Sequence, residues 1–119
     1  MNSCSDDKAK GYIMRRCDEG ATLELLSDDT SEQLSDFFKM FGDPNRIKIL
    51  YLLRDKQVCV NHLADILSMS PSAVSHQLRL LRQMRLITPQ KVGKKTYYSL
   101  ADGHVESIIS IGIKHLNHD

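Results

Sequence analysis

Residues 70–100 read SPSAVSHQLRLLRQMRLITPQKVGKKTYYSL, and this stretch decides the fold. Ser70 is suited to cap a helix, and Pro71 is suited to its first position, where a missing N–H costs nothing. An apolar stripe then recurs at the spacing of one buried helix face: Val74, Leu78 and Leu81. The pattern predicts an amphipathic helix that begins at Pro71.

The opposite face of this predicted helix is polar. Its side chains share the same helical spacing: Ser72, His76, Arg79 and Gln83. Hydroxyl, imidazole, guanidinium and carboxamide groups can hydrogen-bond to phosphates and to base edges in a major groove. The helix is therefore a candidate for reading DNA.

A basic hairpin follows the helix. Residues 88–100 alternate as a strand pair does, with a turn at Gly93 and Lys94. No acidic residue lies between Asp65 and Asp102, and three lysines cluster near the turn: Lys91, Lys94 and Lys95. A block of one charge sign indicates a polyanionic partner. The alternative, an ordinary solvated helix and hairpin, is disfavoured because the polar face and the basic hairpin occur together.

Length and composition bound the remaining possibilities. The chain has 119 residues and a net charge of +1, enough for about one domain with a modest core that dimerisation would stabilise. It lacks a run of roughly 20 apolar residues and the apolar core of a signal peptide. We therefore expect a cytoplasmic protein without a membrane partner. The odd number of cysteines favours free thiols or metal ligands over disulfides: Cys4, Cys17 and Cys59.

The chain before residue 70 predicts an arm and three helices. Residues 1–29 are acidic and weakly periodic, so we expect a mobile arm with at most a short helix over residues 21–26. Residues 30–33 resemble a capping box that opens an amphipathic helix. A second helix starts at Asp43-Pro44 and a third spans residues 60–67. Residues 30–119 then form one DNA-binding and dimerisation domain.

The third helix and the helix at Pro71 have the spacing of a helix-turn-helix. This motif needs a small residue in the first helix, a tight turn, and a branched apolar residue in the second. Ala64, Ser68 and Val74 occupy these places, although glycine is more usual at the turn. The whole order predicts a mainly α fold with a β-hairpin wing, a winged helix-turn-helix.

A second group of polar residues lies near the C-terminus: Asp102, His104, His115 and His118. His104 and His115 are separated by 11 positions, so they share a helix face but lie roughly 16 Å apart. Zn–N bonds are about 2.0 to 2.1 Å long, so one ion cannot join both ends of one helix. An antiparallel pair of helices from two chains solves this, because each end then meets the other end of its copy.

Such a shared N₃O site suits Zn(II) or Co(II). The alternative is that Asp102 only caps the last helix, while the histidines are solvated near a helix C-terminus, where imidazolium is favoured.

The sequence resembles the ArsR/SmtB family of metal-responsive winged helix-turn-helix repressors over about residues 31–118. Four stretches carry the resemblance: DPNR at 43–46, VCVNHLA at 58–64, SAVSHQL at 72–78 and YYSL at 97–100. The resemblance implies a homodimer through the N- and C-terminal helices, with one helix in the major groove and the wing near the minor groove. It also implies that the C-terminal Asp-x-His and His-x-x-His spacing is a zinc-sensing site. The DNA-contacting residues are then Ser72, Ser75, His76, Gln77, Arg79, Lys91, Lys94 and Lys95.

A further metal site is expected at Cys59 and His62, which are close enough on one helix to share an ion. In the family, ligands from the N-terminal arm complete a second site here; Cys17, and with it Cys4, would supply them. Thiolates suit Zn(II), Cd(II) or Pb(II). Asn61 stands where soft-metal sensors of the family often carry another cysteine, so the alternative is a set of inert cysteines.

These observations predict a repressor that leaves a palindromic operator when Zn(II) or a related divalent ion binds, and that controls metal efflux or sequestration genes. One alternative is a soft-metal or redox sensor acting through Cys59 and the arm cysteines, and another is a metal-buffering dimer. An enzyme is not expected, because the sequence shows no nucleophile–base pairing and no phosphate-cradling glycine loop.

Overall fold

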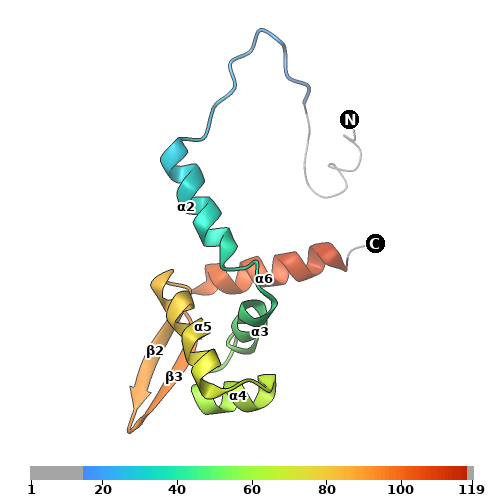
Figure 1. The fold of residues 1–119 in the computed structure, drawn as a ribbon. Helices are drawn as coiled ribbons and strands as arrows, with labels where there is room; N and C mark the ends of the chain where they lie inside the picture. Colours follow the sequence, from blue (N-terminus) through green and yellow to red (C-terminus); the bar gives the residue numbers. More distant parts are fainter. Residues whose placement is uncertain (1–14, 118–119) are drawn as a thin grey trace.

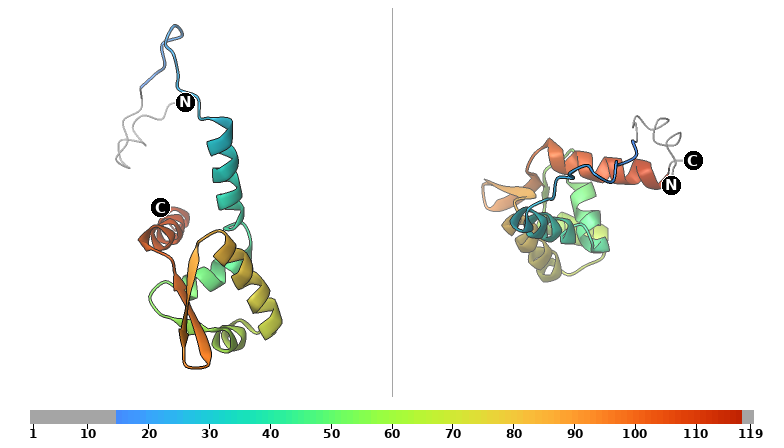
Figure 2. Two further views of the ribbon diagram at one scale, coloured as in Figure 1. Left: turned by 90° about the vertical axis from the view of Figure 1, so that its left-hand side faces the viewer. Right: turned by 90° about the horizontal axis from the view of Figure 1, so that it is seen from above.

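The computed structural model describes residues 15–117. Helices α3, α4 and α5 and the β2–β3 hairpin form the body, α6 crosses it, and α2 leads away from it (Figures 1 and 2). The elements are α2 Asp28–Lys39, α3 Pro44–Leu52, β1 Val58–Cys59, α4 Val60–Leu67, α5 Pro71–Gln83, β2 Ile87–Val92, β3 Lys95–Leu100 and α6 Gly103–Leu116. Within residues 15–117 no helix is long and apolar enough to span a membrane.

The predicted winged helix-turn-helix is confirmed. Helix α5 begins at Pro71, and the Ser70 hydroxyl caps it by accepting from the Ala73 N–H at 3.1 Å. The predicted α5 stripe is fully buried and packs with apolar side chains of α3, α4, the hairpin base and α6. Among the described residues every buried side chain is apolar; those at the centre are Ile49, Leu50, Leu53, Leu63, Val74, Leu78, Leu81 and Leu86.

Both helices of the motif end through a left-handed residue that is not glycine. Ser68 has φ 54° at the end of α4, and Arg85 has φ 61° after α5. In each case the N–H of the next residue donates a hydrogen bond to a carbonyl in the last turn of the helix. Met69 donates to the Ala64 carbonyl and Leu86 donates to the Leu81 carbonyl, both at 3.0 Å. This is a Schellman ending, at which glycine is usual because it has no Cβ to crowd the backbone.

Helix α2 begins earlier than the predicted capping box. The Ser27 hydroxyl accepts from the Thr30 N–H at 3.1 Å, so Ser27 is the N-cap and the prediction from residues 30–33 is wrong. Asp28 and Asp29 fill the first turn, where negative charge is favoured by the helix dipole. Residues 21–26, for which we expect at most a short helix, form no helix; this described segment is irregular and exposed.

The hairpin has one additional strand that the sequence did not reveal. Strands β2 and β3 pair from Ile87↔Leu100 to Val92↔Lys95, and Gly93 turns with φ 64°. Strand β1 pairs antiparallel with the other edge of β3, with Cys59 opposite Tyr97. A two-residue strand is too short to show an alternating pattern. It joins the start of α4 to the middle of β3.

The left-handed turn in the helix-turn-helix gives a stability prediction. Ser68→Gly should raise the free energy of unfolding by about 0.5 to 1 kcal/mol, because glycine avoids the cost of a Cβ at positive φ. Urea denaturation measures the change. Ser72→Gly, in the first turn of α5, is the control and should lower stability. A Ser68→Gly protein no more stable than the unaltered chain would contradict the argument.

Candidate nucleic-acid interface and metal ligands

The polar face of α5 is open to solvent. Ser72, His76 and Arg79 are exposed, and Ser75 and Gln77 are half-buried. The buried stripe on the other side of α5 holds the helix by its apolar side chains, so the polar ones project outward. The structure therefore brings Ser72, His76 and Arg79 together on one face.

Gln77 differs from the rest of this group. Its Oε1 accepts a hydrogen bond from Nη1 of Arg46, at 3.3 Å. Arg46 lies in the first turn of α3, so the carbonyl end of Gln77 is engaged inside the protein. Sequence reasoning missed this contact because 31 residues separate the two partners.

The wing carries its lysines near the tip of the β2–β3 hairpin. Lys91, Lys94 and Lys95 are all exposed. Helix α5 leads directly into β2 and the two elements are in contact, while the tip of the hairpin points away from α5 (Figure 1). Within residues 15–117 the ion pairs involve only Lys39 with Asp36 and His104 with Asp102. The basic side chains of α5 and the wing are thus left without an acidic partner in the described part of the chain.

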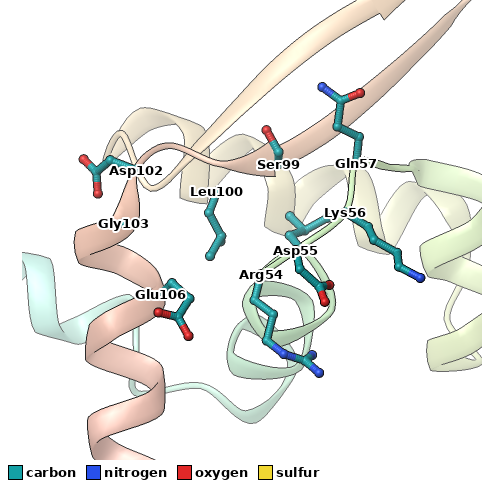
Figure 3. A pocket seen from close by; sticks show the side chains of 10 residues that line it. Arg54, Asp55, Lys56, Gln57, Ser99, Leu100, Asp102, Gly103 and Glu106 are labelled. Atoms are coloured by element: carbon teal, nitrogen blue, oxygen red, sulfur yellow. The ribbon is translucent and has the colours of Figure 1, made fainter.

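Asp102 caps α6, as the alternative interpretation of this residue required. Its Oδ1 accepts from the N–H groups of His104 and Val105, at 2.9 and 3.3 Å, and lies 3.5 Å from Nδ1 of His104. The carboxylate is turned away from the hollow between α6 and the 54–57 loop (Figure 3). Its side chain is 53% exposed and that of His104 is 92% exposed. Capping uses Oδ1 alone, so Asp102 retains an oxygen that can bind an ion.

The remaining C-terminal histidines lie at the far end of α6. His115 is exposed, and His118 lies outside the described residues. At about 100° per residue, His104, Ile111 and His115 share one face, opposite the buried Val105 and Ile109. Among residues 15–117 no three His, Cys, Asp or Glu side chains of one chain gather around a common point. The nitrogen and oxygen donors suit Zn(II) chemically, but one chain does not assemble them.

Within residues 15–117, Cys17 and Cys59 are free thiols, and neither belongs to a group of three potential metal ligands. Cys59 is half-buried at the N-cap position of α4, His62 is exposed, and Cys17 is exposed ahead of α2. Cys4 lies outside the described residues. Cys59 lines an open hollow of about 300 Å³ together with Lys94 and Lys95. Strand β1 therefore places Cys59 beside the outer half of the wing, next to two of its lysines.

This architecture defines a class: a winged-helix transcriptional regulator that binds DNA, and not an enzyme. Residues 43–88 match the family described as "Bacterial regulatory protein, arsR family", and the chain belongs to this family. It is 42% identical over 93 residues to the "Transcriptional repressor SmtB homolog" of Synechocystis sp., covering 78% of this chain and 70% of that protein.

Two other similarities agree with this assignment. The chain is 34% identical over 91 residues to a "Cadmium resistance transcriptional regulatory protein CadC homolog" of Staphylococcus aureus, covering 76% of this chain and 75% of the relative. The solved structure of Rv0081 from Mycobacterium tuberculosis superposes with a TM-score of 0.71 at 27% identity, covering 76% of this chain and 91% of that chain. The expected family and fold are both confirmed.

The exposed wing lysines give a binding prediction. Lys94→Ala or Lys95→Ala should weaken binding to all DNA sequences and reduce the log–log salt slope by about 1, because each removes one phosphate contact. His76→Ala should instead weaken binding to a selected duplex more than to random DNA. Fluorescence anisotropy over a salt series measures both effects.

Lys114→Ala is the matched control, because Lys114 is an exposed lysine in the last turn of α6, away from the wing (Figure 1). It should leave the salt slope unchanged. Equal losses on selected and random DNA for the lysine and histidine variants would contradict the assigned recognition face.

Proposed function

We propose that the protein is a homodimeric repressor in the cytoplasm that binds a palindromic operator and releases it when Zn(II) or a related divalent ion binds. Metal efflux or sequestration genes are the expected targets. The proposal rests on one observation above the others. Helix α6 carries Asp102, His104 and His115 exposed at its two ends, a donor set that one chain cannot close around an ion.

Exposed apolar surface on the first and last helices supports dimerisation. Helix α2 has no buried residue, and its Leu34 and Phe38 are 44% and 51% exposed. On α6, Ile111 is 64% exposed on the face that also bears the histidines. Leu34 and Phe38 are one helical turn apart, so they expose apolar surface on the same face of α2. A second copy would cover it and would also supply the second recognition helix that a palindromic operator requires.

The position of the histidines on α6 supports antiparallel pairing of two such helices. The midpoint of His104 and His115 lies between residues 109 and 110, close to Ile108 and Ile111 on the same face. A two-fold axis at this point superposes the start of each helix on the end of its copy. Asp102 and His104 of one chain would then join His115 and His118 of the other, twice per dimer.

Regulation then follows from linkage between two binding equilibria. Ligands contributed by two chains fix the angle between them, so the spacing of the two α5 helices changes relative to successive grooves. The coupling is reciprocal, and typical values are about 1 to 3 kcal/mol. A metal-buffering dimer would not need the polar α5 face or wing lysines that have no acidic partner within residues 15–117.

Mixed dimers test the shared site directly. His104→Ala and His115→Ala each damage both symmetric sites of their own homodimer. In the mixed dimer one site regains all four ligands and the other loses both histidines. Tight Zn(II) binding should therefore return at one ion per mixed dimer, measured by chelator competition. The affinity should fall as pH falls, because histidine must be unprotonated to bind metal.

His76→Ala provides the control, because His76 is an exposed histidine on α5 that belongs to neither proposed metal site, and it should leave both shared sites intact. Mixed dimers that form without recovering a tight site would show that the ligands are not shared between chains.

A second function is favoured by the environment of Cys59. The thiol lines an open hollow, and His62 lies one helical turn further on α4. We propose that this pair, with Cys17 and Cys4 of an arm, binds Cd(II) or Pb(II). The cadmium-resistance regulator of Staphylococcus aureus among the relatives supports a response to soft metals.

Cadmium titration separates the two sites. Cd(II) should produce thiolate-to-metal absorption in the ultraviolet, which Cys59→Ser abolishes and Cys17→Ser reduces. Release of DNA by Zn(II) should survive both substitutions, which serves as the internal control. Loss of the zinc response in Cys59→Ser would transfer the sensing role to the cysteine site.

A further inference from the structure

The guanidinium of Arg46 forms hydrogen bonds both to the end of α2 and to α5. Its Nε donates to the Met40 carbonyl at 3.0 Å and its Nη2 donates to the Lys39 carbonyl at 3.1 Å. Its Nη1 donates to Oε1 of Gln77 on α5, at 3.3 Å. One side chain therefore holds the end of α2 and the recognition helix at the same time.

The corner between α2 and α3 positions this side chain. The Asp43 carboxylate caps α3 by accepting from the backbone N–H of Arg46 at 3.1 Å. The capped turn places Arg46 beside the last carbonyls of α2, where a cation is favoured by the helix dipole and unpaired carbonyls need donors. Residues 43–46 therefore have a structural role, because Asp43 caps α3 and Arg46 bonds to the end of α2.

Helix α2 depends on this corner for its direction. It has no buried residue, and only Phe37, Met40 and Phe41 near its end pack against the core. The rest of the helix projects from the body (Figure 2). A change in its direction is therefore resisted mainly by the last turn of the helix and by the two Arg46 hydrogen bonds.

The contact with Gln77 determines what that residue presents to DNA. Because Oε1 faces Arg46, the Nε2 amide group is the end left to donate to a base or a phosphate. Arginine suits this task since its planar fork offers donors in several directions, whereas lysine has a single point of charge. A shift of the α2 end would move Arg46, and Gln77 would follow.

We propose that Arg46 is a positioning residue that couples α2 to the recognition helix, so that the arrangement of α2 sets how Gln77 faces DNA. The inference rests on the proposed DNA-binding function and adds a route for its regulation. The exposed Leu34 and Phe38 on α2 would be covered by a second copy. A change in the dimer would thus reach α5 through Arg46 without a contact between Arg46 and DNA.

A double-mutant cycle tests the coupling. Arg46→Met, Gln77→Met and the double variant are compared on a duplex that the unaltered protein selects from a randomised library. We expect Arg46→Met to weaken binding about tenfold alone, and about threefold or less when Gln77 is already replaced. Affinity for random duplex and the salt slope should stay unchanged. Arg46→Lys should behave as Arg46→Met, because it keeps the charge and loses the fork.

Two substitutions serve as matched controls. Arg54→Met removes an exposed arginine whose guanidinium contacts Tyr51 of its own segment, through the Tyr51 carbonyl and the Tyr51 ring. Gln83→Met removes an exposed glutamine at the end of α5. Replacing Gln77 by Met should reduce the effect of Arg46→Lys to about threefold or less, whereas the full effect should persist in the Gln83→Met background. Should Arg46→Met fail to fold, Arg46→Lys completes the same cycle.

Three outcomes would overturn the inference in distinguishable ways. Additive losses in the cycle would show that Arg46 and Gln77 act independently, with the proposed function intact. A salt slope reduced by about 1 in Arg46→Met, and restored in Arg46→Lys, would make Arg46 a phosphate contact. Failure of the unaltered protein to select any duplex would remove the proposed function and this inference together.

Discussion

Burial of one apolar stripe of α5 is the interaction on which the rest of the structure depends. Val74, Leu78 and Leu81 are 0 to 2% exposed, against a core from α3, α4 and α6. Burying a side chain of this size contributes about 1.5 to 3 kcal/mol. This packing fixes the rotation of α5 about its own axis, so the opposite face must point to solvent. The exposure of Ser72, His76 and Arg79 is a consequence of the core.

The sequence predicted the elements that have strong periodicity and missed those that depend on distant contacts. The α5 stripe, the Gly93 turn and the Asp43 cap follow from neighbouring residues and were found. The cap of α2 was misplaced because Ser27 and Thr30 are both good capping residues and local pattern does not rank them. Strand β1 and the contact of Arg46 with Gln77 join residues more than 30 positions apart, and no local pattern reports them.

For the candidate metal ligands, too, the sequence predicted one part of the arrangement and the structure added another. The spacing of His104 and His115 excluded a site within one helix, and in the described part of one chain no such site is formed. Capping by Asp102 was the alternative to ligation, yet the two roles are compatible. One carboxylate oxygen holds the first turn of α6 and the other remains free. If Asp102 both caps α6 and binds an ion, the position of the ion depends on the position of the first turn of α6.

The start of α6 lies a short way from the end of α5. The Ala101 N–H, next to Asp102, donates to the Leu86 carbonyl at 3.0 Å, and Leu86 in turn closes the Schellman ending of α5 at Leu81. The middle of α5 is connected differently, since Gln77 bonds to Arg46 at the start of α3. The recognition helix is therefore tied to α6 at its end and to α2 at its middle. Because α2 and α6 also carry the exposed apolar surface, a rearrangement between two copies would act on α5 from both helices.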